Sequence, residues 1–372
     1  MESKKQQLRK TGVTPSPRER GPGGEVERLI RPHLKDLVPY SSARDDFKGA
    51  ASVYLDANEN PFNSGLNRYP DPHQTELKRA LGSIKNIPTE NIFIGNGSDE
   101  AIDLLFRAFC EPGVDNIITL PPTYGMYKVS AKINNVTVRS VLLDEFFDID
   151  VDRILAQVDS NTKLIFLCSP NNPTGNSLNR EAIKKILINF NGLVIVDEAY
   201  TDFSELPSLT EWLQAFANLV VLQTLSKAWG LASARIGLCM ANQPIISVLN
   251  NIKPPYNISG PDQHKALEAL SHKSETKAKI ESIKSQRAWL ISELNKITKL
   301  VFTVYPSDAN FILVKFTNAN HVYDYLTKAG IIVRNRSKEP NCENCLRITI
   351  GTETENQLLI QKLNKYAKNI IS

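Results

Sequence analysis

The chain has 372 residues, of which 41% are hydrophobic, and this is enough for a large core in two domains or in one domain with a lobe. Its net charge of +4 arises in residues 1–24, which hold six basic and two acidic residues, so the remaining residues carry 38 of each sign. A folded body without net charge argues against nucleic-acid binding, and the lack of an 18-residue apolar stretch argues against a membrane span.

Residues 1–24 are rich in Gly, Pro and polar side chains, and we predict that they form a disordered basic tail. They contain no apolar run of the kind found in secretory signal peptides. The chain also has five cysteines, an odd number. Both observations favour a reducing compartment and predict a cytoplasmic protein.

The next part of the chain alternates strand and helix patterns. Residues 91–95 (NIFIG) are predicted to form a strand, and Ser98 is predicted to begin a helix that reaches Cys110. Further apolar, β-branched runs predict strands at 116–120, 163–168, 193–197, 219–223 and 236–240, with a helix at 180–189. This alternation predicts an α/β fold in which helices flank a mostly parallel central sheet.

The pattern changes after about residue 275. A long helix is predicted at 276–297, strands at 309–316, 331–334 and 346–350, and helices at 321–329 and from 353 onward. We therefore predict a large domain at 57–275 and a smaller α+β domain at 276–372. Residues 25–56 are expected to pack with the smaller domain, because the central sheet begins after them.

Lys227 stands in the segment TLSKAWG, residues 224–230. A lysine that bonds to a phosphorylated aldehyde needs hydroxyls and a guanidinium to hold the phosphate, and Thr224, Ser226 and Arg235 supply these groups. It also needs small neighbours that let the backbone approach the ring. A solvated surface lysine is the alternative, since Ser-Lys pairs are common.

Two further motifs precede this lysine. Asn172 lies in SPNNPTG (169–175), while Asp197 and Tyr200 lie in VDEAY (196–200) at the end of a predicted strand. The order Asn, Asp, Tyr, Lys resembles that of pyridoxal-phosphate enzymes of the aspartate aminotransferase fold. Asp197 would pair with the ring nitrogen, and Tyr200 and Asn172 would bond the ring oxygen. The alternatives are a helix cap for Asp197 and turn chemistry for Asn172.

Gly97, Ser98 and Asp99 occupy a predicted strand-to-helix junction, where a helix N-terminus favours an anion. We predict that they contact the cofactor phosphate, although Ser98 would also serve as a plain helix cap. Tyr124 in PPTYGMY (121–127) is a candidate to stack on the ring, and a core tyrosine is the alternative.

Cys342 and Cys345 form a CxxC motif. A structural zinc site needs four ligands, and no second pair lies nearby in the sequence, so we predict no metal and expect reduced loop thiols.

Several stretches together resemble a known family. They are residues 38–44, 55–61 (LDANENP), 67–70, 97–101, 107–113, 121–127, 169–175, 197–200, 224–227 and 346–351 (LRITIG). From about residue 28 to the C-terminus the chain resembles the class I and II aminotransferases of pyridoxal-phosphate (PLP) fold type I, within them the histidinol-phosphate branch. It departs from the family at Ser233-Ala234-Arg235, usually Gly-Leu-Arg, and at Trp229, usually Phe.

The resemblance implies a homodimer with PLP as cofactor, in which Tyr69 reaches the PLP phosphate of the partner subunit. Arg347 matches the arginine that binds the acidic group of the substrate, and Arg334 and Tyr40 match positions that help bind a phosphomonoester. Two guanidiniums suit a dianionic phosphate better than one, while a surface salt bridge is the alternative for Arg334. Lys227 would be the catalytic general base.

The implied reaction interconverts L-histidinol phosphate and 2-oxoglutarate with imidazole-acetol phosphate and L-glutamate, a step of histidine biosynthesis. Two alternatives of the same fold are an aromatic amino acid aminotransferase and a PLP-dependent decarboxylase of a phosphorylated amino acid. A transcription regulator with an aminotransferase-like domain is a third, but residues 1–24 are too short for a helix-turn-helix domain and the body has no net charge.

Overall fold

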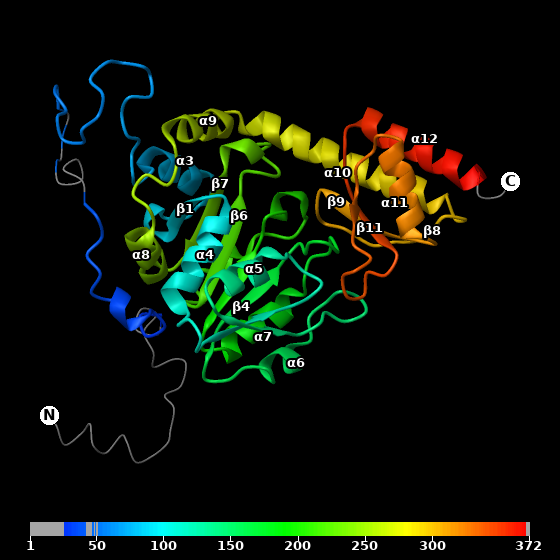
Figure 1. Ribbon diagram of the computed structural model, residues 1–372, viewed down its shortest axis with the longest axis horizontal. Coiled ribbons are helices and arrows are strands. Elements are labelled where there is room, and N and C mark those ends of the chain that lie inside the picture. Colours follow the sequence, from blue (N-terminus) through cyan, green and yellow to red (C-terminus); the bar gives the residue numbers. More distant parts are fainter. Residues whose placement is uncertain (1–25, 42–46, 48, 50, 370–372) are drawn as a thin grey trace, which may run out of the picture.

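The structure is a computed structural model that describes residues 26–41, 47, 49 and 51–369, so the predicted tail at 1–24 lies outside the described residues. It contains a seven-stranded sheet and a four-stranded sheet. Figure 1 shows the larger sheet surrounded by helices and the smaller sheet at the other end of the molecule. The long helix α10 (Lys273–Asn295) runs between the two parts, and the predicted boundary at residue 275 falls in its first turn.

The larger sheet has the strand order β1-β7-β6-β5-β4-β2-β3. Its strands are β1 (Ile92–Asn96), β2 (Asn116–Thr119), β3 (Thr137–Ser140), β4 (Thr162–Cys168), β5 (Leu193–Asp197), β6 (Leu219–Thr224) and β7 (Ile236–Ala241). β7 runs antiparallel to both of its neighbours, β1 and β6, and the other pairings are parallel. The predicted α/β class with a mostly parallel central sheet is therefore confirmed.

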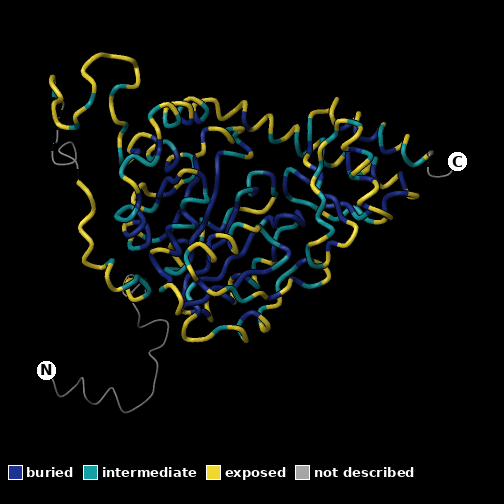
Figure 2. Tube along the Cα trace, in the orientation of Figure 1, coloured by how far each residue is buried: buried dark blue, intermediate teal, exposed yellow. Residues whose placement is uncertain are grey.

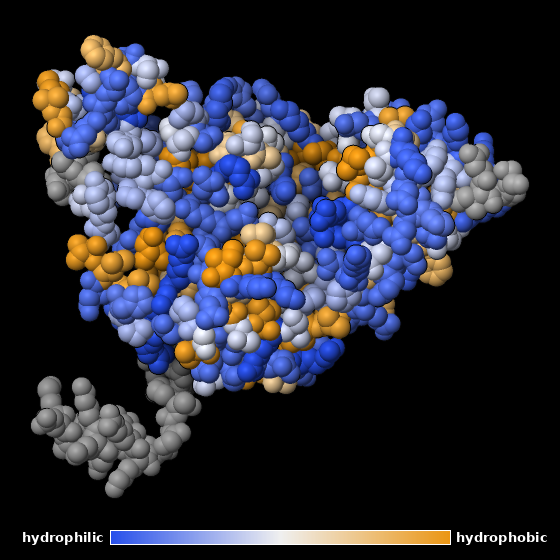
Figure 3. All heavy atoms as spheres, in the orientation of Figure 1, coloured by the Kyte–Doolittle hydropathy of each residue, from blue (hydrophilic) through white to orange (hydrophobic). Residues whose placement is uncertain are grey.

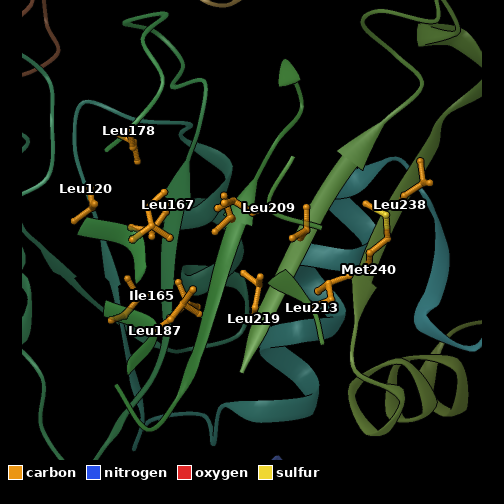
Figure 4. Close-up of a cluster of buried hydrophobic side chains, with 14 of the residues drawn as sticks. Leu120, Ile165, Leu167, Leu178, Leu187, Leu209, Leu213, Leu219, Leu238 and Met240 are labelled. Atoms are coloured by element: carbon orange, nitrogen blue, oxygen red, sulfur yellow. The ribbon is translucent and has the colours of Figure 1, made fainter. Parts of the chain in front are cut away.

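Helices cover both faces of this sheet, which explains the nearly continuous apolar runs in its strands. One face packs on α3 (Thr75–Lys85), α6 (Val151–Leu155), α7 (Arg180–Asn189) and α9 (Gly260–Ser271). Figure 4 shows part of this cluster, which includes side chains of β4, β6 and β7 and Leu187 of α7. The other face packs on α4 (Ser98–Phe109), α5 (Met126–Ile133) and α8 (Gln243–Ile252). Both layers hold the strand ends firmly in place.

The smaller sheet is antiparallel, with the order β10-β11-β9-β8. Its elements are β8 (Val301–Val304), β9 (Phe311–Phe316), β10 (Arg334–Asn335) and β11 (Cys345–Thr349), with α10, α11 (Ala319–Lys328) and α12 (Glu353–Asn369) packed on one face. This is the expected α+β arrangement, although the strand predicted at 331–334 is shorter and begins at Arg334. Short 3-10 helices occur at Pro32–Leu34, Thr89–Asn91, Thr201–Phe203, Leu209–Trp212 and Ala232–Ala234.

The first described residues do not pack with the smaller domain as we expected for 25–56. Val26 is buried in the cluster that contains α4, and Leu34 packs against the same cluster. Arg31 donates its backbone N–H to the carbonyl of Ala108, at 2.9 Å, and pairs with Glu111, at 3.1 Å. The expectation is therefore wrong for residues 26–34, because their apolar side chains fit the helical layer of the larger sheet.

The described residues that follow, 35–41 and 51–69, are extended and mostly exposed. Figure 2 shows this segment in yellow at the end of the molecule away from the smaller sheet, and Figure 3 shows apolar side chains on it. Leu55 is 90% exposed and Phe62 is 81% exposed. None of the helices formed by the described residues is long and apolar enough to span a membrane.

Candidate active site

A cavity opens where β1, β4, β5 and β6 end, at the edge where ligands of parallel sheets bind. Its lining consists of Gly97, Ser98, Asp99, Tyr124, Cys168, Asn172, Asp197, Ala199, Tyr200, Thr224, Ser226, Lys227 and Arg235. Every residue that we predicted to contact the cofactor is among these except Tyr69. The carboxyl ends of the strands thus bring together motifs that are up to 138 positions apart, as from Gly97 to Arg235.

Asp197 is the last residue of β5 and is buried. One carboxylate oxygen, Oδ2, accepts a hydrogen bond from the hydroxyl of Tyr127, at 2.7 Å, and Oδ1 accepts one from the N–H of Ala199, at 3.1 Å. Burial raises the pKa of Asp197, and these two hydrogen bonds oppose the increase because they stabilise the carboxylate. The site therefore offers an oriented acceptor with negative charge.

Tyr127 is a residue of this site to which the sequence analysis assigned no role. It belongs to α5, is completely buried, and stacks on Phe166 with ring centroids 4.7 Å apart. Its pKa lies well above the ordinary value, because burial and the Asp197 charge both disfavour the phenolate. Tyr127 is thus a permanent donor to Asp197. A buried tyrosine in a helix looks like any core residue in the sequence, and only its place in the PPTYGMY segment was a signal.

Lys227 lies in the turn after β6 and is exposed to the open cavity. The cavity walls still remove part of the water around its amine, and this lowers the pKa of Lys227, with smaller contributions from the charges of Arg347 and Arg235. Its Nζ lies 5.8 Å from the centroid of the Tyr200 ring. A lower pKa increases the neutral fraction of the amine, which is the form that acts as a nucleophile or a base.

Asn172, Tyr200 and Arg347 form a chain of contacts between the two sheets. Asn172 Nδ2 donates to the Tyr200 hydroxyl at 3.3 Å, and Arg347 Nη1 donates to Asn172 Oδ1. Arg347 belongs to β11 of the smaller sheet, and its guanidinium also lies 5.3 Å from the centroid of Phe311. The smaller sheet thus places a cation at the border of the cavity.

The other end of the cavity has the properties of an anion site. Gly97 is the N-cap of α4, so no side chain caps the first N–H groups of this helix. It adopts a φ of +73°, and a Cβ there would lie 2.6 Å from Arg235 Nη2. Arg235 Nη2 lies 3.6 Å from Asp99 Oδ2, and the Tyr124 hydroxyl donates to Asp99 Oδ1 at 3.1 Å. The positive φ therefore favours a glycine where the guanidinium crosses the helix end.

Two hydroxyls complete this end. The N–H of Ser226 donates to Thr224 Oγ1 at 3.1 Å, and the two side-chain oxygens lie 2.9 Å apart. Ser233, which differs from the family pattern, is exposed. Trp229 packs on the buried clusters on both sides of this turn. The two departures thus leave Arg235 at the cavity.

Four predicted residues are not part of the cavity lining. Arg347 is one of them, although it donates to Asn172 of the lining. Tyr69 stacks on Tyr256 with ring centroids 4.4 Å apart and lines a separate, larger open depression with residues 65–70. Tyr40 is 72% exposed and lies elsewhere on the surface. Arg334 is exposed and pairs with Arg347 across β10 and β11, so the structure places these two arginines side by side.

The residues of the cavity fit pyridoxal phosphate. The buried carboxylate of Asp197 suits a protonated ring nitrogen, and the uncapped end of α4 with its hydroxyls and Arg235 suits a phosphate. Lys227 lines the same cavity as the carboxylate and the anion site. This combination of one buried carboxylate, one amine of lowered pKa and one anion site is the donor set that such a cofactor requires.

The CxxC motif forms a tight turn whose two cysteines are buried, and the N–H of Cys345 donates to the carbonyl of Cys342 at 3.0 Å. Both thiols are free, and burial raises the pKa of each to about 12. A thiol that ionises so poorly is a weak nucleophile and a weak metal ligand. Across the part of the chain that the structure describes, no group of three His, Cys, Asp or Glu residues is placed to hold a metal ion.

Comparison with known proteins decides the family. The model of the aminotransferase class I and II family matches residues 48–363. The histidinol-phosphate aminotransferase of Bacteroides thetaiotaomicron is 54% identical in sequence, over 92% of this chain and 99% of that protein. This chain belongs to the histidinol-phosphate aminotransferase family.

Solved structures of the family have the same fold. The histidinol-phosphate aminotransferase from Clostridium acetobutylicum superimposes with a TM-score of 0.76 at 25% identity, over 82% of this chain and 92% of that chain. The enzyme from Sinorhizobium meliloti, solved in complex with pyridoxal-5'-phosphate, gives a TM-score of 0.74 at 23% identity, over 82% and 84% of the two chains.

Proposed function

We propose that this chain is the PLP-dependent transaminase that moves the amino group of L-histidinol phosphate to 2-oxoglutarate in histidine biosynthesis. The products are imidazole-acetol phosphate and L-glutamate, and the reaction is reversible. The observation that carries the proposal is the cavity in which Lys227, Asp197, Asn172 and Tyr200 meet, in a chain 54% identical to a histidinol-phosphate aminotransferase.

When bound, pyridoxal phosphate serves as an electron sink for the substrate carbon that loses its proton. Asp197 would hold the ring nitrogen, and the hydrogen bond from Tyr127 favours the ionised form of that carboxylate and orients it. Tyr200 and Asn172 would contact the ring oxygen, and Tyr124 would cover the ring. Gly97, Ser98, Asp99, Thr224, Ser226 and Arg235 would form the phosphate cradle.

Lys227 is the residue proposed to move the proton. Its amine would hold the aldehyde group of the cofactor when no substrate is bound. The lowered pKa of Lys227 favours the neutral amine, which can accept the proton from the substrate carbon. The same amine, once protonated, can donate this proton in the second part of the transfer. Arg347 and Arg235 support the neutral state, because each disfavours a further positive charge.

The substrate phosphate would lie at the smaller sheet. Arg347 and its cross-strand neighbour Arg334 supply two guanidiniums, each with a planar set of donors that matches phosphate oxygens. Tyr40 is proposed to join them. It lies apart from the cavity in one chain, so its contribution requires a second copy.

We also propose that the protein acts as a homodimer in the cytoplasm. Tyr69, stacked on Tyr256 in an open depression, would reach the phosphate site of the partner subunit. The exposed apolar side chains of residues 53–66 support this, because a second subunit would cover them. The five cysteines, all free thiols, support a reducing compartment.

The test is a single half-reaction. PLP-loaded protein is mixed with L-histidinol phosphate in the absence of any keto acid, and absorbance is followed. We expect the visible band of the lysine-bound cofactor to give way to a band at shorter wavelength, and 2-oxoglutarate to restore it. L-phenylalanine, L-tyrosine and L-threonine phosphate are compared as substrates.

If the visible band does not change with L-histidinol phosphate but changes with L-phenylalanine or L-tyrosine, the protein is an aromatic aminotransferase instead. Release of carbon dioxide from L-threonine phosphate would identify a decarboxylase. Either result would leave the cofactor assignment in place and remove the substrate assignment.

A further inference from the structure

The smaller sheet presents alternate side chains to two different environments. Leu346 and Ile348 of β11 are buried in the cluster formed with α10, α11 and α12. Leu313, which lies opposite Arg347 in the register of β9 and β11, is buried instead in the cluster of the larger sheet. Because successive side chains of a strand point to opposite faces, the face that carries Arg347 is turned toward the larger sheet and its cavity.

Arg336 lies on this same face. Its N–H donates to the carbonyl of Cys345 at 2.9 Å, which extends the pairing of β10 with β11 by one residue. Since Arg334 lies opposite Arg347, the alternation brings Arg336 to the side of Arg334 and Arg347. Cys345, its partner, is buried in the cluster of the larger sheet, as this placement requires.

The three guanidiniums of Arg334, Arg336 and Arg347 have fewer carboxylate partners than positive charges. Among the salt bridges of the described residues, the three take part in one, between Arg336 Nη1 and Glu339 Oε1 at 3.5 Å. Arg336 Nε is buried and has no hydrogen-bond partner, and the Arg336 side chain as a whole is 20% exposed. Arg347 donates to the neutral amide of Asn172. A desolvated donor without a partner is costly, so an anion at this face would stabilise it.

The charges also act on one another. Burial lowers the pKa of both Arg336 and Arg347, and the positive charge of Arg334 adds to the decrease in each. The Tyr200 hydroxyl, which belongs to the cavity, lies within electrostatic reach of both guanidiniums. The cluster therefore borders the proposed reaction site and carries more positive charge than one carboxylate balances.

We propose that Arg336 is a specificity-determining residue that joins Arg334 and Arg347 in binding the phosphate group of the substrate. A phosphomonoester carries nearly two negative charges and three acceptor oxygens above its second pKa of about 6, so it satisfies more guanidiniums than a carboxylate does. Arg336 thereby favours phosphorylated amines over ordinary amino acids. This inference rests on the proposed function.

The test uses two variants that should act in opposite directions. Arg336→Gln removes the guanidinium, and Glu339→Gln removes its carboxylate partner. Half-reactions are followed on the PLP-loaded enzyme with L-histidinol phosphate and, separately, with L-glutamate. For Arg336→Gln we expect the half-saturating concentration of L-histidinol phosphate to rise about tenfold or more, with little change in the maximal rate or in the glutamate reaction. For Glu339→Gln we expect a lower half-saturating concentration.

A purely structural ion pair would give a different result, because both variants would then weaken both substrates equally. That outcome, or an unchanged half-saturating concentration in Arg336→Gln, would overturn the inference. Inorganic phosphate provides a second readout. It should inhibit the wild-type half-reaction competitively, and Arg336→Gln should require about tenfold more phosphate for the same inhibition.

Arg336→Lys keeps the charge and serves if Arg336→Gln does not fold. It should show a smaller increase in half-saturating concentration, since an ammonium lacks the planar fork of donors. The role of Arg336 would be contradicted if this concentration did not increase, or if no more phosphate were needed for the same inhibition. If wild-type enzyme ignores L-histidinol phosphate, the proposed function itself fails. If wild type reacts and the variants match it, only the role of Arg336 fails.

Discussion

The cavity at the edge of the larger sheet and the extended segment at residues 51–69 are supported in opposite ways. Asp197 is held by a buried strand, a buried tyrosine and a backbone N–H, all from its own chain. The extended segment has Leu55 and Phe62 exposed, and Tyr69 contacts Tyr256 at the surface. The groups around Asp197 thus come from one chain, while the segment leaves apolar side chains exposed, as interaction surfaces do.

Of the changes considered, loss of Lys227 from the cavity should have the largest effect. Lys227→Ala should lower the rate of the half-reaction by at least about a thousandfold, because the amine that moves the proton is gone. Rapid-mixing absorbance with L-histidinol phosphate measures the loss. Lys184→Ala, an exposed lysine of α7, is the matched control and should react like wild type. Near-normal turnover by Lys227→Ala would remove this residue from the mechanism.

The proposed contact between the extended segment and a partner subunit is tested by mixing two variants of low activity. Tyr69→Ala should lower activity by about tenfold to a hundredfold if its ring and hydroxyl contact the site of a partner. An equal mixture of Tyr69→Ala and Lys227→Ala subunits should regain about a quarter of the wild-type sites, since about half of the dimers are hybrids and one of the two sites in each hybrid is intact.

Turnover of the mixture is compared with that of each variant alone, and mass spectrometry counts the hybrids. Hybrid dimers that form without any gain in turnover would show that Tyr69 serves its own chain or no site at all.

A smaller effect is expected from Tyr127, the buried residue that supports Asp197 within the same chain. Tyr127→Phe removes one of the two hydrogen bonds that oppose the raised pKa of Asp197, so that pKa should rise further. On acidification the carboxylate is then neutralised at a higher pH, and it loses its attraction for a cationic ring. Release of PLP should therefore begin about one pH unit higher than in wild type.

Cofactor absorbance after gel filtration at a series of pH values measures this shift. Tyr124→Phe is the control, because the Tyr124 hydroxyl lies in the same cavity but donates to Asp99. An equal shift in both variants would mean that any lost hydroxyl loosens the cofactor, and that Tyr127 has no particular action on Asp197.

The sequence predicted the elements whose chemistry is local. Apolar β-branched runs located β1, β4, β5, β6 and β7, and the polar residues at their ends predicted which side chains share the cavity. β3 (Thr137–Ser140) was missed, because it is an exposed edge strand with no apolar run to distinguish it from a loop.

What the sequence could not supply depends on packing between distant segments. Val26 has the same apolar character whether it packs on the larger or the smaller domain, and only the shape of the α4 layer decides between them. Likewise, nothing local distinguishes Tyr127 from a core tyrosine, or Arg336 from a surface arginine. Their roles follow from the partner that the fold brings to each, Asp197 in one case and the face of Arg347 in the other.

The bond from Arg347 to Asn172 has a consequence for the placement of Tyr200. The oxygen of this amide is held by a guanidinium from the smaller sheet, while its nitrogen donates to Tyr200 in the cavity. The other N–H groups of this guanidinium remain available to an anion, so Arg347 can hold a charged group and the Asn172 amide at the same time. The smaller sheet thus positions, through a single amide, the hydroxyl beside the cofactor position.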